Sequence, residues 1–245
     1  MKNNPFMKTE ETFTDLMRSF GARNLPRRAF DHFLDVLIAG LSPEPVTVAR
    51  FDLNEYGLED QEIFPRLVHA FTAERNRRAE TGENPDILGE FFELHVAKAP
   101  NCFLPWPVCQ GMARELRIED ASGNAVVDHA CGSGRILLAL TERLPADQPL
   151  YGVAEDWMNA KMAAITLFCS GVRTGEIVVA SFVGGNTHYG GGYTFVSEPP
   201  GVLAIREDDS KLWKRHMEVI RDTPMASEMD ADGSPLTEGL QIRFW

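Results

Sequence analysis

The chain has 245 residues, of which 44% are hydrophobic and 24% charged, and this composition suits a globular protein with one α/β domain and a smaller helical region. The net charge of −12 argues against strong unaided DNA binding, because proteins that bind DNA alone usually carry a basic face. The four cysteines form no Cys-x-x-Cys pair, so we expect no metal. The chain has no bilayer-spanning apolar run and no signal core, so we expect a cytoplasmic protein without a membrane partner.

The N-terminal part of the chain is expected to be helical. Apolar residues recur at helical spacing in 13–20, 30–38 and 63–71. The last run leads into Glu74-Arg75-Asn76-Arg77-Arg78, which could touch a phosphate backbone but is more typical of a solvated helix face. The polar run 81–85 predicts a turn or linker, and we place a domain boundary at its end.

The most informative stretch is 125–138, Ala-Val-Val-Asp-His-Ala-Cys-Gly-Ser-Gly-Arg-Ile-Leu-Leu. It predicts a short buried strand, a tight glycine turn and then a helix. Asp128 ends the strand, where the ligand crevice of an open α/β sheet lies. A second predicted strand, 150–156, ends in Glu155 and Asp156. They follow the turn by about 20 residues, the distance at which a doubly wound fold places an acid on ribose hydroxyls.

The segment Asp128-His129-Ala130-Cys131-Gly132-Ser133-Gly134 resembles the S-adenosylmethionine loop of the N6-adenine DNA methyltransferases, especially the modification subunits of type I restriction–modification systems. In that family the loop usually reads Asp-Pro-Ala-Cys-Gly-Ser-Gly. The preceding run 86–93 resembles the family's helix before the catalytic domain. The run 103–105, Phe-Leu-Pro, resembles the segment that closes over the methionine end of the cofactor.

The resemblance implies an α/β, Rossmann-like class I S-adenosylmethionine-dependent methyltransferase fold with a helical N-terminal appendage. Residues 1–85 would form the helical region, and residues 86–245 a methyltransferase-like catalytic domain without a full target-recognition domain. Glu155 and Asp156 remain alternatives for the ribose, and Asn186, in a Gly-Asn-Thr turn, would meet the adenine ring. The candidate cofactor-binding residues are Phe103, Pro105, Asp128, Ala130, Cys131, Gly132, Ser133, Gly134, Glu155, Asp156 and Asn186.

A glycine-rich run, 188–192, is expected to be a loop, and the strand after it leads to Glu198-Pro199-Pro200-Gly201. This tetrapeptide stands where the family carries Asn-Pro-Pro-aromatic. Glu198, Pro199 and Pro200 are therefore the catalytic candidates. Glu198 replaces the asparagine that accepts from the target amino group. Gly201 replaces the ring that stacks on a flipped-out base, a contact worth about 1–3 kcal/mol.

These observations lead to two functional hypotheses. The first is an S-adenosylmethionine-dependent DNA adenine-N6 methyltransferase-like protein that is weak or dependent on a partner subunit, by which DNA would be reached. The alternative is a catalytically inactive methyltransferase-fold binding protein, a pseudoenzyme that acts as regulator or decoy in restriction–modification. Glu198 and Gly201 favour the alternative, while the loop favours retained cofactor binding.

Overall fold

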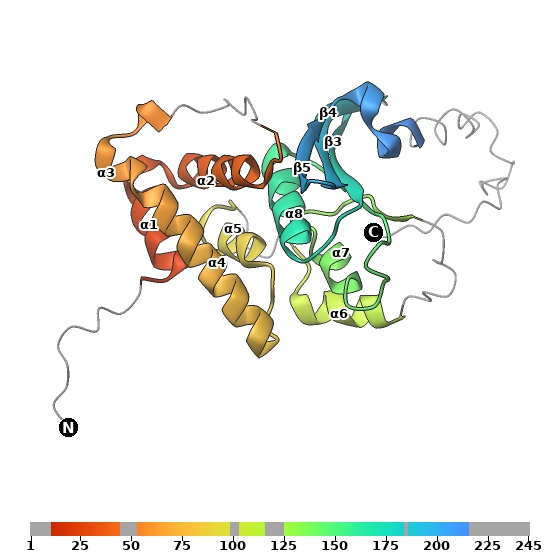
Figure 1. Ribbon diagram of the computed structural model, residues 1–245, viewed down its shortest axis with the longest axis horizontal. Coiled ribbons are helices and arrows are strands. Elements are labelled where there is room, and N and C mark those ends of the chain that lie inside the picture. The colour runs from red at the N-terminus through yellow and green to blue at the C-terminus, as the bar shows by residue number, and fades with distance from the viewer. Residues whose placement is uncertain (1–10, 45–52, 99–102, 116–124, 184–185, 216–245) are drawn as a thin grey trace, which may run out of the picture. The chain divides into compact units, whose positions relative to one another are not determined.

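The computed structural model describes residues 11–44, 53–98, 103–115, 125–183 and 186–215 (Figure 1). The chain divides into two compact units, Met1–Trp106 and Pro107–Trp245. The boundary therefore follows Trp106, whereas the sequence predicts it at residue 85. The difference arises because the helix after residue 86 packs into the first unit.

The first unit is a helical bundle with a core rich in phenylalanine. The ring of Phe13 contacts those of Phe33, Phe71 and Phe91, with centroids 5.4, 5.9 and 5.5 Å apart. Ring pairs of this kind add to the stabilisation that burial of apolar surface supplies. Because Phe91 belongs to this core, its helix is part of the first unit. The described helices are α1 (Phe13–Asn24), α2 (Pro26–Leu41), η1 (Leu53–Glu55), α3 (Leu58–Gln61), α4 (Ile63–Thr81) and α5 (Ile87–His95).

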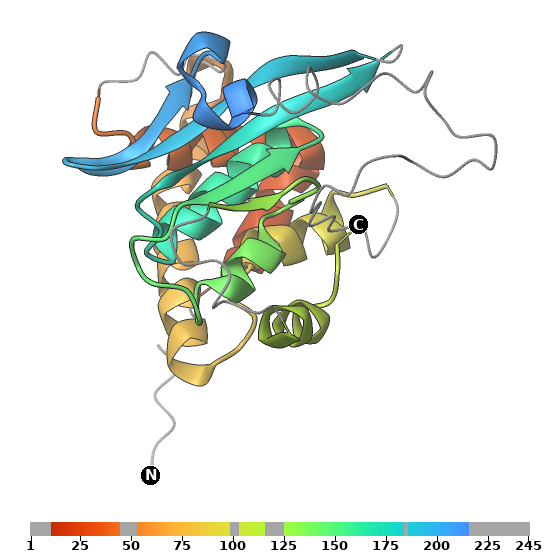
Figure 2. The ribbon, with the colours of Figure 1, turned by 90° about the vertical axis from the view of Figure 1, so that its right-hand side faces the viewer.

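The second unit is built on a five-stranded mixed sheet in the order β1-β2-β3-β4-β5. The first three strands are parallel, and β4 and β5 run antiparallel to their neighbours. The helix α8 lies against the sheet and contacts β2, β3, β4 and β5 (Figure 2). The elements are α6 (Trp106–Glu115), β1 (Val126–Asp128), α7 (Arg135–Leu140), β2 (Leu150–Ala154), α8 (Trp157–Cys169), β3 (Gly175–Val183), β4 (Asn186–Ser197), β5 (Pro200–Ile205) and η3 (Glu207–Asp209).

The run β1–α7–β2 has the strand–helix–strand alternation that the sequence predicts around the glycine turn, and α8 and β3 continue it. In a doubly wound fold the fourth strand returns to the far side of the first. Here β4 pairs with β3, so β1 is an edge strand within the described part of the chain. The structure thus establishes a mixed α/β fold that shares its first three strands with the doubly wound pattern.

The sequence predicts a loop at the glycine-rich run 188–192, but in the structure this run is part of β4. A register shift beside Gly190 marks a β-bulge against β3. At Gly191, φ is +123° and an added Cβ would lie 2.4 Å from the ring of Trp157. Glycine is required there because the indole of α8 packs directly on the strand backbone.

A buried carboxylate, Glu176 of β3, fastens the last described residues to the sheet. Its side chain is 3% exposed and accepts hydrogen bonds from the Ser210 hydroxyl at 2.8 Å and from the backbone N–H groups of Lys211 and Leu212 at 3.1 and 3.0 Å. Hydrogen bonds to an ionised acceptor are strong, and they compensate the burial of the charge. The carboxylate of Glu176 therefore has a structural role.

Candidate cofactor site at the glycine loop

The predicted loop and the two carboxylates lie together at one edge of the sheet. Asp128 is the last residue of β1, and Glu155 and Asp156 come directly after β2. The N–H of Cys131 donates to the carbonyl of Val153 at 2.9 Å, which holds the loop beside β2. Because β1 and β2 are parallel, these groups share the carboxyl edge, the usual ligand edge of such sheets.

Two glycines give the loop its shape. Gly132 and Gly134 have φ of +52° and +87°, in the left-handed region that favours glycine. A Cβ on Gly134 would lie 3.2 Å from the Cα and Cβ of Ala163 in α8. A side chain at this position would push the loop away from the helix. The tight turn that the sequence predicts is therefore confirmed.

Asp128 is the unusual residue of this edge. It is 4% exposed, and its Oδ1 accepts a hydrogen bond from the N–H of Ala130 at 3.0 Å. Its Oδ2 is buried and has no hydrogen-bond partner in the described part of the chain. Burial raises the pKa of the carboxyl group, because the charged form is poorly solvated. A donor or a cation that reached Oδ2 would offset this cost.

Within the loop, some side chains are buried and one is accessible. Cys131 is 5% exposed, and its Sγ lies 2.8 Å from where a Cβ of Gly152 would stand, so the thiol fills the space above that glycine. Burial raises the pKa of the Cys131 thiol, which keeps it protonated. Ser133 is fully buried, whereas Ala130 is exposed. The side chains of Cys131 and Ser133 therefore belong to the interior of the loop.

The two carboxylates after β2 have different surroundings. Asp156 is the N-cap of α8, and its side chain accepts from the N–H of Asn159 at 2.8 Å. N-capping of this kind is a common role of aspartate at the start of a helix. Glu155 is exposed and pairs with no other described side chain. The structure thus uses Asp156 as a helix cap and leaves the carboxylate of Glu155 exposed, while the contact of either residue with ribose stays a prediction.

Asn159 is a polar residue of this edge that the sequence does not reveal. It lies in the first turn of α8, and its Oδ1 is buried with no hydrogen-bond partner among the described residues. No motif marks an asparagine within a helix, since most such residues are solvated. Its side chain is half-buried, and only the buried, unpartnered Oδ1 singles it out.

The segment predicted to close over the cofactor is attached to the first unit. The N–H of Phe103 donates to Glu93 Oε1 at 2.9 Å, and its ring lies 5.7 Å from that of Phe92 in α5. Pro105 is exposed. The role of Phe103 and Pro105 at the cofactor stays a prediction.

Asn186 is the first residue of β4, and its backbone pairs with Val183 at the end of β3. The carboxyl end of β3 lies at the same edge as Asp128, because β1, β2 and β3 are parallel. The structure thus brings the backbone of Asn186 to the predicted edge, while its contact with adenine stays a prediction.

The catalytic candidates lie at the opposite edge of the sheet. Glu198 and Pro199 form the turn between β4 and β5, and Pro200 begins β5. Through the strand pairs Asp128 is level with Tyr193. Glu198 is therefore about 17 Å from that level along the strands and about 14 Å from β1 across the sheet. The structure therefore does not bring Glu198, Pro199 and Pro200 together with the glycine loop, because β4 runs antiparallel to β3 and carries them away from it. Their catalytic role stays a prediction.

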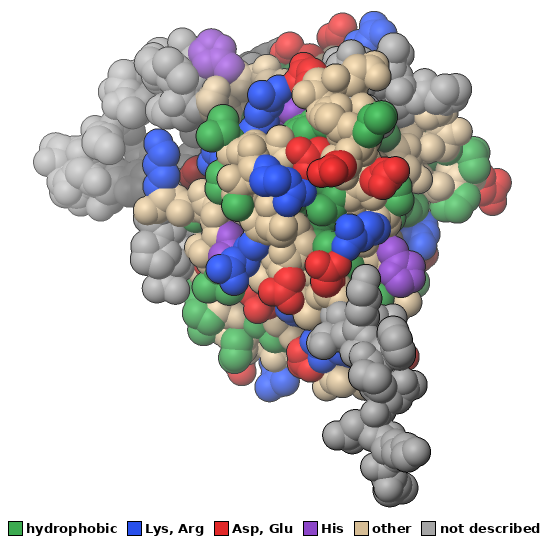
Figure 3. Space-filling view, turned by 90° about the vertical axis from the view of Figure 1, so that its left-hand side faces the viewer, with side chains coloured by type: hydrophobic (Ala, Val, Ile, Leu, Met, Phe, Trp, Pro, Cys, Tyr) green, Lys and Arg blue, Asp and Glu red, His purple; other side chains and the backbone are tan. Residues whose placement is uncertain are grey.

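The arginine run of the first unit is held by neighbouring carboxylates. Arg77 pairs with Glu74 at 2.9 Å and with Glu83 at 2.5 Å, and Arg78 pairs with Glu74 at 2.8 Å and with Glu90 at 2.6 Å. On the face shown in Figure 3, basic and acidic side chains are interspersed. These pairings agree with the interpretation of the run as a helix face, since Arg77 and Arg78 are already paired with carboxylates.

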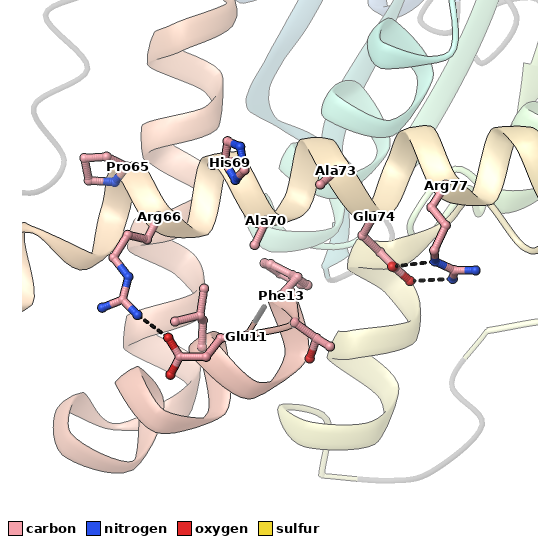
Figure 4. A pocket seen from close by; sticks show the side chains of 11 residues that line it. Glu11, Phe13, Pro65, Arg66, His69, Ala70, Ala73, Glu74 and Arg77 are labelled. Atoms are coloured by element: carbon pink, nitrogen blue, oxygen red, sulfur yellow. Dashed lines mark hydrogen bonds and ion pairs between the residues drawn. The ribbon is translucent and has the colours of Figure 1, made fainter. Parts of the chain in front are cut away.

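A cavity of about 630 Å³ lies between the start of α1 and α4 (Figure 4). Phe13, Ala70 and Ala73 contribute apolar lining, and Arg66 pairs with Glu11 at its rim. No predicted cofactor or catalytic residue lines this cavity. It is therefore separate from the glycine loop.

Among the described residues, no group of three or more His, Cys, Asp or Glu side chains is arranged to hold a metal ion. No helix in the described ranges has the length and apolar character needed to cross a membrane. The chain matches no protein-family model, no curated protein and no solved structure.

Proposed function

We propose that this chain is a Rossmann-like, methyltransferase-like protein that binds S-adenosylmethionine at the glycine loop and acts as a binding protein, without methylating adenine by itself. The observation that carries the proposal is the buried Oδ2 of Asp128, which lacks a hydrogen-bond partner in the described chain. A buried acceptor in this state is costly, and a ligand donor offsets the cost.

The chemistry of S-adenosylmethionine suits this edge. Its ammonium group would donate to Asp128, whose ionised form a cation stabilises. Its ribose hydroxyls would donate to Glu155, since a carboxylate accepts two hydrogen bonds from a vicinal diol. The exposed Ala130 and the backbone of Gly132 and Gly134 would line the ligand, while Cys131 and Ser133 support the loop from inside.

The position of the degenerate tetrapeptide argues against adenine-N6 methylation by this chain. S-adenosylmethionine supplies an activated methyl group, and transfer requires the acceptor to lie within about 3–3.5 Å of the methyl carbon. Glu198 is several times that distance from Asp128 along the sheet and stands at the other edge. The alternative hypothesis of an inactive binding protein therefore has more support than the first.

Partners and location rest on the resemblance alone. As a regulator or decoy in restriction–modification, the chain would meet a partner subunit in the cytoplasm and reach DNA through it. The net charge of −12 supports pairing with a basic partner protein rather than direct binding to a phosphate backbone.

The proposal is tested by calorimetric titration of the full chain with S-adenosylmethionine, for which we expect saturable binding with a Kd in the micromolar range. The absence of heat at millimolar ligand, from a sample with a cooperative unfolding transition, would contradict it.

A labelled-methyl assay on adenine-rich DNA tests the second part of the proposal. We expect no transfer by the wild type, and no gain in the double variant Glu198→Asn with Gly201→Phe, because both positions lie at the wrong edge of the sheet. Methylation that rises in this variant would show that the tetrapeptide does serve the cofactor site.

A further inference from the structure

Two side-chain oxygens of the second unit are buried without a hydrogen-bond partner in its described residues. They are Oδ2 of Asp128 and Oδ1 of Asn159. Buried polar atoms are nearly always paired in folded proteins, so each exception needs a reason. The sequence predicts a ligand site at Asp128, whereas no sequence motif predicts a role for Asn159.

Asn159 shares a face of α8 with the residues that pack on the glycine loop. A Cβ on Gly134 would touch Ala163 and, at 3.6 Å, Leu167 Cδ1, so this stripe of α8 packs on the loop. Residues four apart lie on the same face of a helix. Asn159 therefore continues the stripe by one turn toward the N-terminus of α8, and this turn lies at the carboxyl end of β2 beside the loop.

The fold does not account for the side chain of Asn159. The start of α8 is capped by Asp156, which accepts from the backbone N–H of Asn159 and leaves its amide group unused. The side chain of Asn159 is half-buried, but its Oδ1 is fully buried, and a buried acceptor without a donor is costly. A hydrogen-bond donor from a bound ligand would supply the partner that the Oδ1 of Asn159 lacks.

We propose that Asn159 is a ligand-contacting residue whose side-chain oxygen accepts a hydrogen bond from the ammonium group that Asp128 also binds. An ammonium group has three donors, so one cation can donate to both oxygens. This inference rests on the proposed function and adds a specificity residue to it: Asn159 selects ligands whose adenosine carries an amino-acid arm with an ammonium group.

The test compares two ligands by calorimetry. S-adenosylmethionine has the ammonium group, and 5′-methylthioadenosine lacks it. For Asn159→Ala we expect at least about a 10-fold loss of affinity for S-adenosylmethionine, since hydrogen bonds to charged groups are among the stronger ones. Affinity for 5′-methylthioadenosine should stay within about 2-fold of the wild-type value, because no contact is removed.

Asn24→Ala is the matched control. The amide of Asn24 in α1 donates to the Phe20 carbonyl at 3.3 Å and to Asp60 Oδ2 at 2.9 Å. Its loss should lower the melting temperature and leave ligand affinity unchanged. Asn159→Ala should show the reverse, a reduced affinity with an unchanged or raised melting temperature.

The outcomes are distinguishable. An unchanged affinity of Asn159→Ala for S-adenosylmethionine overturns the inference while the proposed function stands. An equal loss for both ligands overturns the ammonium contact. A wild type that binds neither ligand contradicts the proposed function, and the contact at Asn159 falls with it.

Discussion

Glu176 and Asp128 are two carboxylates of one sheet that are buried to the same degree but differ in the hydrogen bonds that they receive. Glu176 is 3% exposed and receives three hydrogen bonds, whereas Asp128 is 4% exposed and receives one, on one oxygen. The comparison shows that burial of a charge does not by itself mark a functional site. The hydrogen bonds that the fold leaves unmade distinguish the two roles.

The largest expected effect is on the structural carboxylate. Glu176→Ala removes the acceptor for the Ser210 hydroxyl and two backbone N–H groups and leaves these donors buried. We expect the free energy of unfolding in urea to fall by about 3 kcal/mol or more. A loss below about 1 kcal/mol would mean that water replaces the carboxylate, and the contrast with Asp128 would fail.

A smaller loss of stability is expected from a change in the backbone of the glycine loop, because this change alters packing and no charge. Gly134→Ala places a Cβ at a φ of +87° and 3.2 Å from Ala163. We expect a loss of about 1–2 kcal/mol in the free energy of unfolding. Gly111→Ala in α6 is the matched control, because an added Cβ meets nothing within 4 Å and should stabilise the helix slightly. Equal effects of the two changes would contradict the close packing of the loop.

Asp128→Asn should raise stability, by up to about 1 kcal/mol at neutral pH, because asparagine buries no charge. Burial raises the pKa of Asp128, so the folded state holds this proton more tightly than the unfolded chain. Wild-type stability therefore falls as the pH rises from the ordinary value of 3.8 through the raised pKa. Urea unfolding at acid and neutral pH measures the difference in free energy of unfolding between the variant and the wild type. This difference should be absent below that pH range and complete above it.

Glu74 should show the opposite pH dependence. Hydrogen bonds from Arg77 and then Arg78 lower its pKa to about 2. Its contribution to stability is present above the ordinary value of 4.5 and is lost as the pH falls toward 2. Glu74→Gln should lower the free energy of unfolding by about 1 kcal/mol at neutral pH. Glu80→Gln in the same helix should change little, and a similar loss in both variants would indicate a general charge effect.

The sequence predicts the elements around the loop well because their patterns are local. The strands at 125–127 and 150–156, and the helix that follows the glycine turn, are marked by apolar runs and glycines, and they are found close to their predicted positions. The turn at Gly132 and Gly134 is predictable for the same reason, since its φ values require glycine.

The remaining features of the second unit depend on contacts between residues far apart in the sequence, which a local sequence pattern does not predict. The run 188–192 looks like a loop, yet backbone pairing with β3 needs no side chains, and Trp157 uses the space that Gly191 leaves free. The direction of β4 follows from this hairpin and decides that Glu198 lies away from Asp128. The buried, unpaired oxygen of Asn159 also depends on the fold, since no local pattern shows which side-chain atoms the packing will bury.

The most direct test of this account is calorimetric titration of Asp128→Asn beside the wild type with S-adenosylmethionine. We predict that the variant, which keeps the shape of the side chain and the acceptor for Ala130, unfolds cooperatively and binds at least about 100-fold more weakly, as expected when a charged partner of a cation is removed. Equal affinity of the two proteins would contradict the claim that the fold leaves this oxygen of Asp128 unpaired for a ligand.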